Sequence, residues 1–132
     1  MKIQIFSLCD YAQNNAGKLT IIGTFNRIFA DSFPFIYTPP VFVVAKVCSN
    51  KACNGVFNFS ATTPDGTLLL PPLKGEFRID NPDNDEKEKA FDFCLALNNL
   101  SFNKSGTYTF KFEVDGLIAT QELYLSPRPV KE

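Results

Sequence analysis

Residues 106–116 carry the clearest pattern in the chain and limit most strongly what it can fold into. Apolar residues occupy every second position from Tyr108 to Val114, and polar residues lie between them. Side chains on a strand alternate between its two faces, so this stretch is predicted to be a strand with one buried face. Asp115-Gly116 tolerates positive φ at both positions, which favours a two-residue hairpin turn. A second alternating run, 117–125, follows and is interrupted on its apolar face by Gln121.

Six further stretches have strand-like composition: 2–10, 19–25, 41–48, 56–63, 73–79 and 91–97. The first has mixed faces, which suggests an edge strand, whereas 41–48 is almost continuously apolar and is predicted to be central. Asn14–Gly17 and Pro64-Asp65-Gly66 are turn sequences, and Gly23 inside its strand indicates a bulge or a close backbone approach. No stretch has a 3.6-residue period. About eight short strands indicate an all-β sandwich or barrel.

Gly106-x-Tyr108 favours the sandwich. It resembles the tyrosine corner of immunoglobulin-like sandwiches, in which the hydroxyl bonds to upstream backbone. Lys104 stands where an acidic residue is common, and there is no tryptophan for the Cys…Trp…Cys arrangement of antibody domains. The predicted fold is an all-β, antiparallel β-sandwich of immunoglobulin-like or Greek-key type.

The 132 residues are expected to form one domain, 1–132, with 126–132 as a disordered tail. The formal charge of −1 and the lack of a basic stripe argue against nucleic acid as a partner. No apolar run approaches the ~20 residues of a membrane span. The first ten residues lack the apolar core of a secretory signal, so we expect a cytoplasmic protein with reduced thiols.

The chain contains no histidine, which removes the commonest general base and most transition-metal sites. It also lacks the G-x-S-x-G, P-loop and G-x-G-x-x-G motifs. The protein is therefore predicted not to be an enzyme and to bind no cofactor.

Two groups of residues have some features of a metal site. Cys9, Cys48, Cys53 and Cys94 include one C-x₄-C pair and two single residues, which is unlike a structural zinc site. Inert thiols are the favoured interpretation, and a Cys48–Cys53 disulfide is an alternative. The acidic loop 80–89 lacks the spacing and the glycine of a calcium loop, so it is predicted to be a solvated connection.

Residues 28–40 are the best candidate for a binding site. They combine three prolines with several aromatic residues, and the candidate partner-binding side chains are Phe29, Phe33, Phe35 and Tyr37. Exposed aromatic patches are typical of partner surfaces. The alternative is that these rings fill the end of the core.

These observations favour a non-catalytic module that binds a protein partner or a second copy of itself, through this segment and one exposed sheet edge. The alternative is a small-molecule or carbohydrate binder, in which Tyr11, Tyr37 and Tyr124 would provide stacking platforms.

The chain also resembles a family of small uncharacterised bacterial proteins known as a domain of unknown function. The resemblance rests on the joint order of Leu8-Cys9-Asp10-Tyr11-Ala12, Gly23-Thr24-Phe25, Phe33-Pro34, Pro64-Asp65-Gly66, Leu70-Pro71-Pro72-Leu73, Gly106-x-Tyr108 and Val114-Asp115-Gly116. It implies a stand-alone, cytoplasmic, immunoglobulin-like β-sandwich. It implies no activity and no functional residues.

Overall fold

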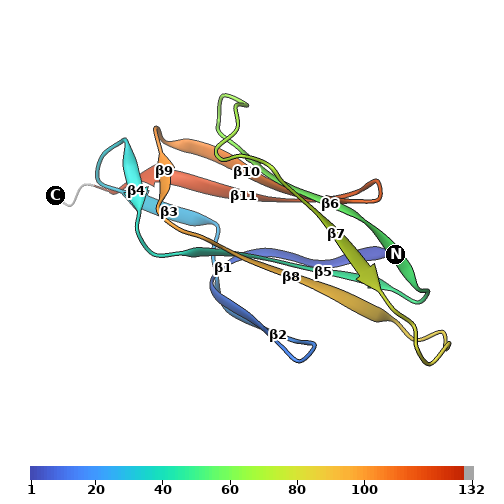
Figure 1. Cartoon of the computed structure of the whole chain (residues 1–132). Coiled ribbons are helices and arrows are strands. Elements are labelled where there is room, and N and C mark those ends of the chain that lie inside the picture. The colour runs from blue at the N-terminus through green and yellow to red at the C-terminus, as the bar shows by residue number, and fades with distance from the viewer. Residues whose placement is uncertain (130–132) are drawn as a thin grey trace.

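The computed structural model describes residues 1–129, which form two layers of β-sheet (Figure 1). One sheet has four strands in the order β2-β1-β5-β8, and the other has five in the order β3-β11-β10-β6-β7. A two-stranded sheet, β4-β9, lies at one end. The strands are β1 (Lys2–Asn15), β2 (Lys18–Thr24), β3 (Arg27–Ala30), β4 (Phe35–Tyr37), β5 (Val41–Ser49), β6 (Cys53–Thr62), β7 (Leu73–Ile79), β8 (Lys89–Leu97), β9 (Leu100–Phe102), β10 (Gly106–Val114) and β11 (Leu117–Pro127).

Aromatic rings from both sheets meet in the core between the layers. Phe112 on β10 lies 5.7 Å from Phe57 on β6 and 5.3 Å from Phe93 on β8, between ring centroids. Phe6 on β1 approaches the same ring from the four-stranded sheet, at 6.0 Å. These contacts join the two sheets through one aromatic cluster.

The β10–β11 hairpin confirms the prediction from the alternating pattern. Tyr108, Phe110, Phe112 and Val114 are buried, and β10 pairs antiparallel with β11 along its whole length. Asp115 and Gly116 form the turn with φ of 50° and 81°. Both lie in the left-handed region that Asp-Gly sequences tolerate. On the other side β10 pairs with β6, where Phe57, Phe59 and Ala61 face the core.

The tyrosine corner is present. The buried Tyr108 hydroxyl donates a hydrogen bond of 2.7 Å to the carbonyl oxygen of Lys104. The ring packs edge-on against Phe102 of β9, at 4.9 Å between centroids. The corner therefore ties β10 to the loop that precedes it, and the lysine at position 104 does not prevent this because the acceptor is backbone.

We expect Tyr108→Phe to lower the free energy of unfolding by about 1 kcal/mol, because it removes the hydrogen bond between the Tyr108 hydroxyl and the Lys104 carbonyl. Urea denaturation of the variant beside the wild type measures this. A change within the error of the measurement would show that the hydroxyl contributes nothing to the corner.

The first strand is central rather than at an edge, so that prediction is wrong. β1 pairs with β5 through residues 2–9 and with β2 through residues 9–15. The register shifts between Ile3 and Ile5, which is a β-bulge. Ile3 packs on the core before the shift, and Phe6 and Leu8 do so after it. The bulge therefore explains the mixed faces seen in the sequence.

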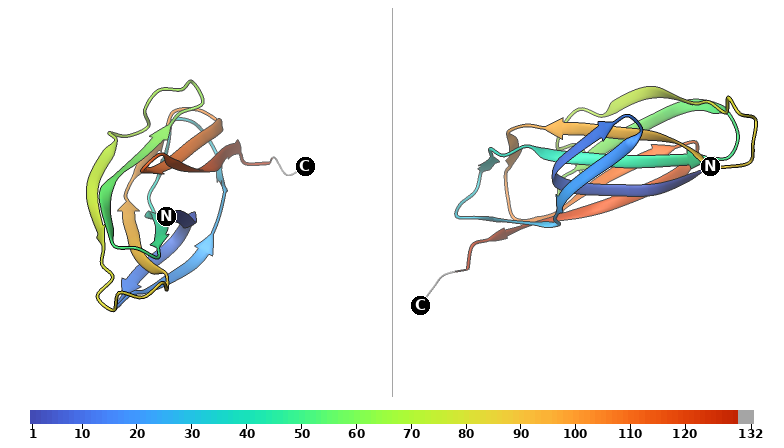
Figure 2. Two further views of the ribbon diagram at one scale, coloured as in Figure 1. Left: turned by 90° about the vertical axis from the view of Figure 1, so that its right-hand side faces the viewer. Right: turned by 90° about the horizontal axis from the view of Figure 1, so that it is seen from below.

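The outer half of β1 and all of β2 form a ribbon that folds across the outer face of the four-stranded sheet (Figure 2). Cys9, Ala12 and Val44 form a second small core beneath the ribbon. Gly23 has φ of 69°, and a Cβ there would lie 2.5 Å from Asp10 Oδ2. This is the close approach that the sequence predicted, and it ends the ribbon where the chain crosses to the five-stranded sheet.

The structure contains eleven strands among its described residues, rather than about eight. The additional ones are β3, β4 and β9, each of three or four residues. They form because a distant strand supplies the pairing partner, and such short segments have too little periodicity to be recognised locally. Ser126 and Pro127, which the sequence assigned to a tail, belong to β11 and pair with Phe29 and Ala30 of β3. Residues 130–132 of that predicted tail lie outside the described residues.

No helix that could cross a membrane occurs in the part of the chain that the structure describes.

Candidate functional site

The candidate segment 28–40 lies at one end of the sandwich and contains β3 and β4. The prolines at 34, 39 and 40 lie outside both strands, as expected for residues that cannot donate to a ladder. β3 pairs in parallel with the end of β11, and β4 pairs with β9. The segment therefore joins the edge of the five-stranded sheet to the small sheet that covers the end.

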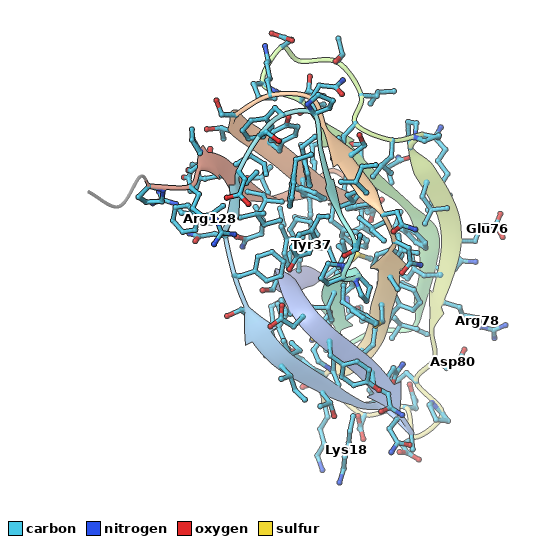
Figure 3. The ribbon with its side chains drawn as sticks, turned by 90° about the vertical axis from the view of Figure 1, so that its left-hand side faces the viewer. Lys18, Tyr37, Glu76, Arg78, Asp80 and Arg128 are labelled. Carbon is cyan, nitrogen blue, oxygen red and sulfur yellow. The ribbon has the colours of Figure 1, made fainter. Side chains whose placement is uncertain are left out.

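The four predicted binding residues divide into two groups. Phe33, Phe35 and Tyr37 are partly buried and pack against the main core. Tyr37 lies 6.5 Å from Phe25 and 6.4 Å from Phe35, between ring centroids. In Figure 3, which looks onto this end, Tyr37 lies between the two layers. This placement matches the alternative in which the rings fill the end of the core.

Phe29 is different because its side chain is 43% exposed. On β3 the neighbouring Ile28 is buried, so Phe29 faces outward from the five-stranded sheet, as does Arg27. Tyr124 faces the same way from β11, between the buried Leu123 and Leu125. The guanidinium carbon of Arg27 lies 5.8 Å from the ring centroids of both Phe29 and Tyr124. We call Arg27, Phe29 and Tyr124 the arginine–aromatic cluster.

Charged groups lie next to this cluster along β3 and β11. The Tyr124 hydroxyl donates a hydrogen bond of 2.6 Å to Glu122, which raises the pKa of the tyrosine, and the charge of the carboxylate adds to the effect. Arg128 Nε lies 2.7 Å from Asp31 Oδ1, and its backbone N–H donates to Ala30. An apolar and cationic centre with a polar surround is the typical arrangement of a protein-binding patch.

Sequence reasoning identified Phe29 as a partner-binding residue and Tyr124 only as a sugar platform in the alternative interpretation, and it missed Arg27. Tyr124 is paired with Arg27 across the parallel β3–β11 contact, 97 positions apart in the chain. The alternating face of 117–125 shows that Tyr124 points outward. No local signal shows that β3 lies beside it.

The three tyrosines proposed as sugar platforms do not share one surface. Tyr11 is on the ribbon over the four-stranded sheet and packs 5.3 Å from Phe42, between ring centroids. Tyr124 is on the outer face of the opposite sheet, and Tyr37 packs at the end of the core. Burial raises the pKa of the Tyr37 phenol, and the nearby Asp10 carboxylate adds to this.

The four cysteines are free thiols. Cys9 and Cys94 lie in the small core under the ribbon, where Cys94 Sγ donates to the Ala12 carbonyl at 3.4 Å. Cys48 Sγ lies 3.1 Å from Gln4 Oε1. Burial is the main cause that raises the pKa of Cys9, Cys48 and Cys94. Raised pKa values keep these thiols protonated and poorly nucleophilic at neutral pH.

The acidic loop forms contacts within itself. Asp85 accepts hydrogen bonds from the Lys89 ammonium group and from the Lys87 backbone N–H, and these lower the pKa of its carboxyl group. Asn81 donates to the Asp85 carbonyl at 2.9 Å. Within residues 1–129, no three side chains of the metal-binding types are grouped to hold an ion.

Each sheet has two outer strands whose outer edge pairs with no other strand among the described residues. These are β2 and β8 in the four-stranded sheet, and β3 and β7 in the five-stranded sheet. A shallow groove of about 470 Å³ lies over β6 and β7 and is lined by Asn54, Gly55, Val56, Glu76, Phe77 and Arg78. Exposed edges present unpaired backbone groups to which another chain can add.

Comparison with known proteins gives one match, to a family model that covers most of the chain. No curated protein matches it. A family model described as "Family of unknown function (DUF6941)" matches residues 4–124, which include all or part of every strand and the arginine–aromatic cluster. The chain belongs to this family of unknown function.

Proposed function

We propose that the protein is a non-catalytic interaction module that binds another protein through the arginine–aromatic cluster. The observation that carries this proposal is the exposed Phe29 ring beside Arg27 and Tyr124 on the outer face of the five-stranded sheet. Tyrosine and arginine are among the residue types most enriched in those that dominate binding energy at interfaces. On this face the Phe29 ring lies beside Arg27 and is 43% exposed, and it is not part of the core cluster between the sheets.

The chemistry of the cluster indicates what a partner must present. Phe29 offers an apolar contact area, and an arginine held near two rings offers planar donors that fit a carboxylate. We expect the partner to place an apolar side chain on Phe29 and an Asp or Glu close to Arg27. The ion pair between Arg128 and Asp31 contributes a polar rim.

The same proposal includes an immunoglobulin-like connectivity and a cytoplasmic location. The connectivity is supported by the parallel pairing of β3 with β11, the β10–β11 hairpin and the tyrosine corner at Tyr108. The location is supported by four free thiols, which fit a reducing compartment.

We expect Phe29→Ser to weaken partner binding by about thirtyfold, the effect of losing one dominant interface residue. The melting temperature is expected to change little, because substitutions at exposed positions usually cost no more than about 0.5 kcal/mol. The measurement is an affinity capture from native-host lysate with quantitative mass spectrometry, run beside thermal melts.

The matched control is Ile22→Ser, which removes an exposed apolar side chain from β2, in the other sheet. Partners that are lost with Phe29→Ser and retained with Ile22→Ser support the proposal. Equal retention by both variants and the wild type would contradict it. A thermal-shift screen with a sugar panel tests the carbohydrate alternative, since a ligand of the native state raises the melting temperature.

A further inference from the structure

β7, one of the two outer strands of the five-stranded sheet, carries charges of alternating sign along one face. Phe77 and Ile79 of β7 are buried, and the residues between and beside them point outward. The outward series is Lys74, Glu76, Arg78 and, directly after the strand, Asp80. Figure 3 shows Glu76, Arg78 and Asp80 along the outer side of this strand, directed away from the sandwich. Arg78 Nε lies 2.6 Å from Asp80 Oδ1, and both side chains are mostly exposed.

The other side of β7 is open. β7 pairs with β6 from Leu73 to Ile79, and no other strand among residues 1–129 pairs with its outer edge. Pro72 precedes the strand and Pro82 follows it shortly after. Proline cannot donate to a ladder, so these two residues limit the length over which another strand can be added. The window in which another strand can pair with this edge is residues 74–80, so the added strand must be short.

The charges of this window are complementary to those of the same window in a second copy of the chain. In an antiparallel pair related by a two-fold axis, residues directly opposite each other point to the same face of the sheet. If the axis passes at Phe77, Glu76 lies opposite Arg78 of the second copy and Lys74 lies opposite its Asp80. The two-fold axis repeats both pairs, so every charge in the window meets its opposite.

The neighbouring register places like charges opposite each other. With the axis at Glu76, the two Glu76 side chains lie opposite each other and Lys74 lies opposite Arg78. All of these are pairs of like charge, which destabilise a sheet when directly opposite. A register centred on Gly75 brings Pro72 into the ladder. The charge order and the prolines together select the arrangement centred on Phe77.

We propose that two copies of this protein associate through β7, antiparallel and centred on Phe77, so that their five-stranded sheets form one continuous sheet. This surface is separate from the arginine–aromatic cluster, since β7 and β3 are the opposite outer strands of the five-stranded sheet. The inference goes beyond the proposed function, because it adds self-association at a second surface and does not require that Phe29 bind a partner.

Charge reversal tests the register directly. Glu76→Arg places the introduced guanidinium opposite Arg78 of the second copy, and Arg78→Glu places the introduced carboxylate opposite its Glu76. We expect each single variant to raise the dimer dissociation constant about tenfold or more at low salt, because two attractive pairs become repulsive. The double variant Glu76→Arg/Arg78→Glu restores opposite charges and is expected to dimerise like the wild type.

A mixture of the two single variants gives the most specific test of the pairing between Glu76 and Arg78. At positions 76 and 78 the Glu76→Arg protomer carries only positive charge and the Arg78→Glu protomer only negative charge. An equimolar mixture is therefore expected to form heterodimers, while each variant alone is weakened. Lys18→Glu on β2 is the control for a charge change away from β7. Sedimentation velocity over a concentration series, at low and high salt, measures all of these species.

Recovery of association in the mixture and in the double variant supports the proposal. A wild-type protein that stays monomeric throughout the series overturns it, and so do single variants that dimerise as the wild type does. Phe29→Ser is expected to dimerise normally. A dimer lost in Phe29→Ser and kept in both charge variants would assign self-association to the other surface and overturn the β7 pairing.

Discussion

Phe112→Ala is expected to lower the free energy of unfolding by about 3–5 kcal/mol, the cost usually found when a buried phenylalanine is truncated. Phe112 is fully buried on β10, in the middle of the five-stranded sheet. Its ring contacts Phe57 in its own sheet, and Phe6 and Phe93 in the opposite sheet. The substitution therefore removes the ring at which both layers meet and leaves a cavity between them.

Urea denaturation at 25 °C measures this effect, and Phe29→Ala is the matched control because it removes the same ring from an exposed position. We expect the control to change stability by less than about 0.5 kcal/mol. A loss of less than about 1 kcal/mol in Phe112→Ala would contradict the packing of the two sheets described above.

Asp92→Ala is expected to cost about 3 kcal/mol, toward the lower end of the range for breaking a buried ion pair. Lys46 on β5 and Asp92 on β8 are directly opposite each other on the outer face of the four-stranded sheet. Their side chains are only 19% and 5% exposed, and Nζ lies 2.9 Å from Oδ1. Removing the carboxylate leaves a lysine in a largely buried position without its counter-charge.

The double variant Lys46→Met/Asp92→Leu provides the control. Replacing both members of a buried pair by apolar residues of similar size is often neutral or stabilising. We therefore expect the double variant to be at least about 2 kcal/mol more stable than Asp92→Ala. Equal destabilisation in the two variants would show that the cost arises from altered packing at position 92 rather than from the unpaired charge.

Local patterns in the sequence predicted the parts of the fold that depend on neighbours in the chain. The alternation in 106–114, the Asp115-Gly116 turn and the buried run of β5 are set by side-chain period and backbone preference, and the structure confirms them. The predicted position of β1 is wrong because its bulge shifts the inward face by one residue. A period-two pattern cannot reveal such a shift without the partner strand.

Features that join distant parts of the chain are not visible in local patterns. Gln121 interrupts the apolar face of β11 because its side-chain amide donates to the Phe6 carbonyl at 2.9 Å, across to the other sheet. The pairing of Tyr124 with Arg27 depends on the β3–β11 contact in the same way. The alternating charges of β7 can be seen in the sequence. Their significance depends on the strand order, which places β7 at an open edge.

Site-specific photocrosslinking tests the proposed interaction surface most directly. A benzophenone analogue of phenylalanine replaces Phe29 in one protein and Ile22 in another, and each is irradiated in native-host lysate. The proposal predicts a discrete adduct of defined mass at position 29 that is absent at position 22, with the crosslinked peptide of the partner containing Asp or Glu near an apolar residue. No adduct at position 29, or the same adducts at both positions, would contradict a protein-binding role for the arginine–aromatic cluster.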